Sequence, residues 1–260
     1  MRFLEKQSSC SRSMVLLAPR GACLHAFSGP VTFSDSLHSR LIGKVQRLRG
    51  DVYLKDGALH PSRLTRSGRH FSPFDKHSWH LLTVRSDGAV LGCIRFLRHP
   101  NTITSEQLRV AGAPLARSRD WRASFFSSLD CEIEAARQSD FSYVEIGGWA
   151  LAQELRGTRE ALQIVLSTYA LAQLQGGALG ITTATERNGS ASILRRLGGR
   201  PLEWGGAAVP PYFDRTYNCG MQVLRFDSRR PSERYASSVD SLKRRITHLP
   251  VFCPGLTFPR

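Results

Sequence analysis

The stretch from Val144 to Gln175 decides the predicted fold and reads VEIGGWALAQELRGTREALQIVLSTYALAQLQ. Residues 144–151 are rich in bulky side chains that favour a strand, but the pair Gly147-Gly148 interrupts them. A glycine pair inside a strand indicates a bulge, or a place where another backbone or a ligand comes close. After a polar turn over residues 153–158, apolar side chains recur at helical spacing, at Leu162, Val165, Leu166 and Tyr169. The stretch therefore predicts a bulged strand that leads into a helix through a short turn.

The start of this helix has the features of an anion site. The first N–H groups of a helix have no partner within it and lie at the positive end of its dipole. Arg156 and Arg159 add two positive charges at this point. An ordinary strand, turn and helix with solvated arginines gives the same pattern, so the residues alone leave both interpretations open.

Positive charge is the main feature of the composition. Lys and Arg number 36 against 21 Asp and Glu, which gives a net charge of +15, and the excess lies in three segments, Arg40–Arg69, Arg95–Arg122 and Arg225–Arg260. Clustered positive charge predicts an acidic partner, which is nucleic acid, an anionic membrane or an acidic protein. A generally arginine-rich composition is the alternative. Aromatic residues are not interleaved with the arginines, so no nucleic-acid partner is expected.

Cysteine and histidine spacing indicates no metal site. The six cysteines are scattered without a C-x-x-C pair, and the eight histidines lack metal-ligand spacing. We therefore expect no metal and a reduced, cytoplasmic protein. The apolar content of 41% is typical of a globular chain, and no apolar run is long enough to span a bilayer.

The expected elements divide the chain into three parts. Residues 1–32 have no clear period and predict a loose arm. A helix after Ser34, a hairpin over Trp79–Leu97 and alternating helices and strands up to Phe226 predict an α/β domain with a mixed sheet over residues 33–227. Residues 228–260 predict a basic extension with one helix over Ser232–Thr247.

The turn after the bulged strand resembles the acyl-donor motif of the GNAT N-acyltransferase superfamily, Arg/Gln-x-x-Gly-x-Gly/Ala. Arg156 takes the first position and Ala161 the last, while Arg159 stands where the middle glycine is expected. The element order also matches this superfamily. The resemblance implies a splayed central sheet flanked by helices, with an acyl-phosphopantetheine donor between the parted strands. The residues implied in donor binding are Ala150, Leu151, Arg156, Gly157, Thr158, Arg159, Glu160 and Ala161.

Further short motifs between Arg40 and Phe226 resemble the acyl-homoserine-lactone synthases and the related N-acyl amino acid synthases. They are Arg49 with Val52 and Tyr53, then Phe74-Asp75, then Gly92 with Arg95, Phe96 and Leu97. The E-x-x-R motif of this branch keeps Glu145, but Gly148 replaces its arginine, which counts against lactone synthesis. The branch implies an acyl group carried by acyl carrier protein, with coenzyme A as the alternative carrier, and no permanently bound cofactor.

The resemblance also implies roles for the site residues. Glu145 is the expected general base, and the competing interpretation is a strand-end glutamate paired with an arginine. Arg49, Asp75 and Arg95 are expected around the amine acceptor, with a structural ion pair as the alternative. Trp149 is either a wall of the acceptor pocket or part of the core. Tyr212 and Tyr217 are each either a proton donor to the leaving thiolate or a packing residue.

The predicted function is therefore an N-acyltransferase that moves a long-chain acyl group from acyl carrier protein to the amine of an amino acid or similar small acceptor. The basic segments suit docking of acyl carrier protein, which is acidic, and leave room for association with a membrane surface that receives a lipid product. Two alternatives stay open: a coenzyme A-dependent N-acetyltransferase, and a non-catalytic GNAT-like protein that binds an anionic partner.

Overall fold

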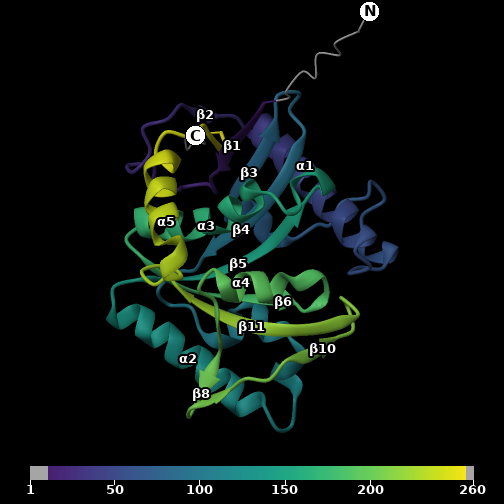
Figure 1. Cartoon of the computed structure of the whole chain (residues 1–260), viewed down its shortest axis with the longest axis vertical. Coiled ribbons are helices and arrows are strands. Elements are labelled where there is room, and N and C mark those ends of the chain that lie inside the picture. Colours follow the sequence, from purple (N-terminus) through teal and green to yellow (C-terminus); the bar gives the residue numbers. More distant parts are fainter. Residues whose placement is uncertain (1–10, 256–260) are drawn as a thin grey trace, which may run out of the picture.

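A single twisted sheet organises the chain in the computed structural model, which describes residues 11–255. Within these residues the strand order is β10-β11-β6-β5-β4-β3-β1-β12-β2, and β7 pairs with the outer side of β11 (Figure 1). The strands of this sheet are β1 (Arg12–Leu17), β2 (Val31–Phe33), β3 (Trp79–Arg85), β4 (Val90–Arg98), β5 (Ser142–Leu151), β6 (Ala178–Thr185), β7 (Arg200–Pro201), β10 (Tyr212–Asp214), β11 (Cys219–Asp227) and β12 (Val251–Cys253). A separate hairpin joins β8 (Glu203–Trp204) to β9 (Ala207–Ala208).

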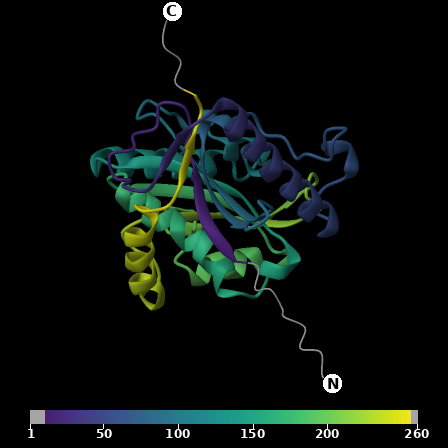
Figure 2. The ribbon, with the colours of Figure 1, turned by 90° about the horizontal axis from the view of Figure 1, so that it is seen from above.

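Helices cover both faces of the sheet (Figure 2). They are α1 (Asp35–Lys55), α2 (Arg122–Gln138), α3 (Arg159–Leu174), α4 (Ser190–Arg196) and α5 (Glu233–Ile246). Apolar side chains of α1 and α2 pack on one face, and those of α3, α4 and α5 pack on the other. The fold class predicted from the sequence, a mixed sheet flanked by helices, is confirmed.

Helix α1 begins where the sequence predicts it. The Ser34 side chain accepts a hydrogen bond from the backbone N–H of Leu37, which satisfies one of the free donors of the first turn. The helix continues through Arg49 to Lys55, so this arginine lies on a helix face that is buried against the sheet.

Both ends of the chain differ from the prediction. The loose arm expected over residues 1–32 is wrong for β1, which lies inside the sheet between β3 and β12; residues 1–10 lie outside the described part. The extension expected over residues 228–260 is also part of the fold, because α5 packs on α3 and β12 pairs with β1 and β2. Met14–Ala18 is buried on both faces, so it lacks the alternation that identifies a strand.

The centre of the sheet is split. Strands β5 and β6 run parallel and pair from Ser142 to Glu145 and from Ala178 to Ile181. Past these residues, β5 stays with β4 and β6 stays with β11, so the two strands part. The register between β4 and β5 shifts at Gly148, whose φ of 63° lies in the left-handed region that glycine tolerates. The predicted bulge and splay are confirmed.

Candidate active site

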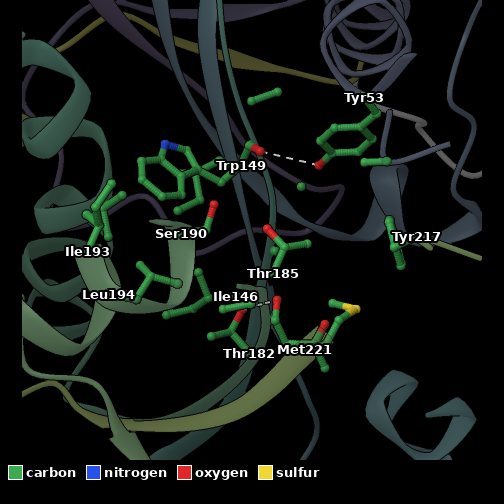
Figure 3. Close-up of a pocket in the computed structure, with 18 of the residues that line it drawn as sticks. Tyr53, Ile146, Trp149, Thr182, Thr185, Ser190, Ile193, Leu194, Tyr217 and Met221 are labelled. Atoms are coloured by element: carbon green, nitrogen blue, oxygen red, sulfur yellow. Dashed lines mark hydrogen bonds between the residues drawn. The ribbon is translucent and has the colours of Figure 1, made fainter. Parts of the chain in front are cut away.

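A cavity of about 700 Å³ lies where β5 and β6 part. Ile146 and Trp149 of β5, Leu162 and Val165 of α3, and Ile193 and Leu194 of α4 form apolar parts of its wall. Figure 3 shows Trp149, Ile193 and Leu194 on one side of this pocket, with Tyr53 and Tyr217 on the other. The cavity therefore has room and apolar surface for a ligand larger than a few water molecules.

The charge around this cavity is mainly positive. Six arginines and three carboxylates line it: Arg49, Arg95, Arg109, Arg156, Arg187 and Arg196, with Asp56, Glu145 and Asp214. A concave surface lined mostly by one sign of charge attracts ligands of the opposite sign. The cavity thus favours an anionic ligand with an apolar portion.

Three elements bring together the cluster predicted from the sequence, Arg49 on α1, Asp75 on the short helix η2 (Pro73–His77) and Arg95 on β4. Arg49 donates from Nη1 and Nη2 to both carboxylate oxygens of Asp75, and Arg95 Nη1 lies 3.3 Å from Asp75 Oδ1. Gln46 Nε2 also donates to Asp75 Oδ2 at 2.9 Å. Asp75 is 1% exposed, and its contacts are those of a structural ion pair. Of the three residues, only Arg49 and Arg95 line the cavity.

Opposing effects act on the pKa values of this cluster. Burial alone would raise the pKa of Asp75, but the hydrogen bond and charge of Arg49 outweigh it and hold the pKa well below its usual range. Burial lowers the pKa of Arg95 to about 10, and the positive charges of Arg109 and Arg49 act in the same direction. The cluster therefore carries more positive charge than Asp75 compensates.

The glycine pair lies under three guanidinium groups. A Cβ atom at position 148 would lie 3.0 Å from Arg49 Nη1, and one at position 147 would lie 3.6 Å from Arg95 Nη2 and 3.7 Å from Arg109 Nη1. Arg49 therefore occupies the space next to Gly148, where the related motif has an arginine in the strand itself. Sequence reasoning missed Arg109, whose only signal was its place in a basic segment.

Glu145 is buried at the point where the two strands part. Its Oε1 accepts a hydrogen bond from the backbone N–H of Arg109 at 2.7 Å and lies 3.0 Å from Nε2 of His99. Its Oε2 accepts from the backbone N–H of Val110 at 3.1 Å. These contacts differ from the arginine pairing considered above, and they attach the segment that carries Arg109 to β5. The role of Glu145 as a general base stays a prediction.

The predicted donor turn reaches the cavity in part. Thr158 caps α3 by accepting a hydrogen bond from the backbone N–H of Ala161, and Gly157 has a φ of 75°. Six of the predicted donor residues line the cavity: Ala150, Leu151, Arg156, Gly157, Thr158 and Ala161. Arg159 and Glu160 are not among the lining residues; Arg159 is exposed, and Glu160 lies 3.7 Å from Arg12.

The predicted aromatic residues also line the cavity. Trp149 is half-buried, and its indole Nε1 is buried without a hydrogen-bond partner. Tyr53 donates from its hydroxyl to the Trp149 carbonyl at 3.3 Å. Burial raises the pKa of both Tyr212 and Tyr217, so each keeps its proton at neutral pH. Both interpretations of these tyrosines, proton donor and packing residue, stay open.

Two histidines next to the cluster, the buried His80 and the half-buried His70, should make the protein less stable in mild acid. Burial lowers the pKa of His80 to about 3 and that of His70 to about 4, so the folded state needs both rings neutral. The unfolded chain binds these protons near pH 6.5, so stability is complete above this pH and is lost as pH falls. We expect urea denaturation to give an unfolding free energy that falls below pH 6.5, by at most about 1.4 kcal/mol per pH unit for His80.

A variant separates this effect from general acid sensitivity. His80→Gln removes one of the rings that titrate in this range, so its unfolding free energy should fall less steeply between pH 6.5 and 5 than that of the wild type. Equal slopes for the two proteins would contradict the assignment to His80.

Neither a metal site nor a membrane-spanning helix is found in the described residues. Within residues 11–255, no group of three or more His, Cys, Asp or Glu side chains has the arrangement of a metal site. Among the helices of this part of the chain, none combines the length and hydropathy that crossing a bilayer requires.

Comparison with known proteins identifies the fold. No protein-family model matches the sequence, and no curated protein matches it. Among solved structures, the coenzyme A-dependent acyl-homoserine lactone synthase BjaI, with SAM and isopentyl-CoA, has a TM-score of 0.57 and 16% identity, and the match covers 95% of this chain and 96% of that chain. FeeM, an N-acyl amino acid synthase from uncultured soil microbes, has a TM-score of 0.50 and 10% identity, with 85% and 93% covered. The chain therefore has the GNAT-like fold of these acyl synthases, over nearly its whole length.

Proposed function

We propose that the protein is an N-acyltransferase that moves a long-chain acyl group from a phosphopantetheine thioester, carried by acyl carrier protein, to the amine of a small acceptor with a carboxylate. The observation that carries this proposal is the gap between β5 and β6, which opens into a cavity with apolar and arginine-lined walls. The likeness to BjaI and FeeM supports the fold that such a reaction uses.

The donor arm fits the gap by chemistry and by shape. Past Glu145, the backbone of β5 has no partner strand on the β6 side, so an extended pantetheine arm can bond there like an added strand. Its phosphate would then reach the turn from Arg156 to Ala161, at the start of α3. The acyl chain would lie against Leu162, Val165 and Leu194, between α3 and α4.

The acceptor would lie on the other side of the thioester, over the glycine pair. We propose that Arg49, Arg95 and Arg109 bind its carboxylate, because their three positive charges exceed the single negative charge of Asp75. Asp75 was expected near the amine acceptor, but its oxygens already accept hydrogen bonds from Arg49, Arg95 and Gln46. We therefore give Asp75 the role of positioning the two arginines.

The reaction requires one proton to leave the amine and another to reach sulfur. The amine nitrogen attacks the thioester carbon, the C–N bond forms, and the C–S bond breaks to release a thiolate. Glu145 would take the amine proton through a water molecule, and Tyr217 or Tyr212 would give its proton to the thiolate. The backbone N–H of Leu151 would face the thioester oxygen, whereas that of Ala150 points toward Cys93 of β4.

Exposed arginines on α4 and α5, of which Arg196 lines the cavity, support an acidic protein as the donor carrier. Arg195 and Arg196 lie on α4, and Arg244 and Arg245 lie at the end of α5, all of them exposed. Positive patches of this kind steer association with a negatively charged partner. Coenzyme A is the second candidate carrier, because BjaI is described as coenzyme A-dependent.

A direct assay tests the proposal. The purified protein is given palmitoyl acyl carrier protein or palmitoyl-CoA together with a mixture of amino acids, and mass spectrometry detects N-acyl products. We expect an amide from at least one donor. Thr183→Trp should abolish its formation, because Thr183 is exposed and lines the cavity, so the larger ring fills the gap. Thr32→Trp, at an exposed position of β2, is the matched control and should keep activity. Absence of amide with both donors would contradict the proposal.

A further inference from the structure

Arg156, the first residue of the donor motif, already has an anionic partner. Its Nη2 lies 2.9 Å from Oδ2 of Asp56, and its Nε lies 3.4 Å from the carbonyl oxygen of Leu151. Asp56 is the C-cap residue of α1 and lines the same cavity. The carboxylate of Asp56 is therefore already paired with the guanidinium that we expect to bind the donor phosphate.

The end of α1 is held against both walls of the gap. Arg187, which follows β6, donates from Nη1 to the carbonyl oxygen of Gly57 at 2.6 Å, and from Nη2 to that of Asn218. Arg156, which follows β5, holds Asp56 from the other side. Gly57 has a φ of 64°, which lets the chain turn between these two contacts. The position of the Asp56 carboxylate is thus fixed by the fold.

A second carboxylate, that of Glu160, lies at the start of α3. Glu160 lies in the first turn of this helix, where its own backbone N–H and the Thr158 hydroxyl lower its pKa. It lies 3.7 Å from Arg12, which is not part of the donor turn. Arg12 therefore balances the charge of Glu160, and Asp56 is the carboxylate that contacts Arg156.

We propose that Asp56 is a specificity-determining residue that makes the site select a donor with one phosphodiester over the more highly charged coenzyme A. This inference rests on the function proposed above. Coenzyme A carries a pyrophosphate and a further phosphate, whereas a carrier-bound arm carries one phosphodiester. The Asp56 carboxylate therefore repels coenzyme A more strongly than it repels the carrier-bound arm. A single phosphodiester can be bound by the free backbone N–H groups of the turn together with Arg156, even while Arg156 stays paired with Asp56.

The test compares two donors in three proteins. Asp56→Asn keeps the size of the side chain and removes its charge. We expect kcat/KM for palmitoyl-CoA to rise about fivefold relative to that for palmitoyl acyl carrier protein, the effect of about 1 kcal/mol that exposed charge pairs reach. Asp51→Asn, an exposed aspartate on the same helix, is the matched control and should leave this ratio unchanged.

Calorimetry with coenzyme A alone gives a readout that does not depend on turnover. Asp56→Asn should bind coenzyme A about fivefold more tightly than the wild type does. The inference would be overturned if Asp56→Asn changed neither the ratio of kcat/KM for the two donors nor the affinity for coenzyme A. Weaker binding of coenzyme A would also overturn it, because Asp56 would then hold Arg156 in a productive position. A missing amide product with both donors, while Asp56→Asn still tightens coenzyme A binding, would overturn the proposed function and the donor selectivity that rests on it, and would leave only the repulsion between Asp56 and coenzyme A standing.

Discussion

Replacing Asp75 with alanine is expected to lower the free energy of unfolding by about 3–5 kcal/mol, the usual cost of breaking a buried ion pair from one side. Asp75 and Arg49 are each 1% exposed, and Arg95 is 3% exposed. Without the carboxylate, two guanidinium groups remain buried next to each other without a compensating charge. Urea denaturation at pH 7 measures the loss, and tryptophan fluorescence, to which the buried Trp79 contributes, follows the transition.

A second carboxylate provides the control for this prediction. Asp87 pairs with Arg85 at 2.8 Å, but its side chain is 53% exposed, so water screens the pair. Asp87→Ala should leave the denaturation midpoint nearly unchanged, because exposed ion pairs contribute little to stability. If Asp75→Ala behaved like Asp87→Ala, the buried cluster would not be a source of stability.

The pH dependence of Asp75 adds a test with a defined sign. Because Arg49 holds its pKa below that of the unfolded chain, its contribution is fully present above about pH 4 and is lost as pH falls further. Asp75→Asn cannot titrate, so the difference in unfolding free energy between this variant and the wild type should shrink below pH 4. A constant difference down to pH 3 would contradict this reading of the cluster.

The sequence predicts the elements whose signals are local. The bulge follows from Gly147-Gly148, the first turn of α1 from Ser34, and the start of α3 from the polar turn before it. Strand β1 was missed because both its faces are buried and its partners, β3 and β12, lie far along the chain. Apolar and polar residues alternate only in a strand with one face exposed, so a strand that is buried on both faces gives no such signal.

The candidate site is predictable only where a motif is continuous in sequence. Arg49, Asp75 and Arg95 were found through short motifs, and the structure brings them together. Arg109 reaches the glycine pair because Glu145 holds its backbone, and no sequence pattern encodes this contact. Asp56 meets Arg156 across 100 positions of the chain, so only the fold reveals that pair.

Replacing Glu145 with glutamine is expected to lower kcat by about 10²–10⁴-fold, the usual contribution of a general base. Glutamine has nearly the same size as glutamate, but it cannot take a proton from the amine at neutral pH. Its amide oxygen can still accept one of the two backbone N–H groups, from Arg109 or Val110, that now hold the carboxylate. The KM for the donor should change little, because the donor turn is formed by other residues.

Arg109→Ala separates this base role from a purely positional one, since Glu145 also fixes the segment that carries Arg109. Loss of the guanidinium should raise the KM for the acceptor, whose carboxylate it is proposed to bind, and should leave kcat within about threefold, because uniform binding energy affects KM alone. Glu145→Gln should instead lower kcat and leave the acceptor KM nearly unchanged. Part of the lost kcat should return at higher pH, where more of the amine is already neutral. If both variants raised the acceptor KM and left kcat intact, Glu145 would act only by placing Arg109, and the amine would have to lose its proton to water.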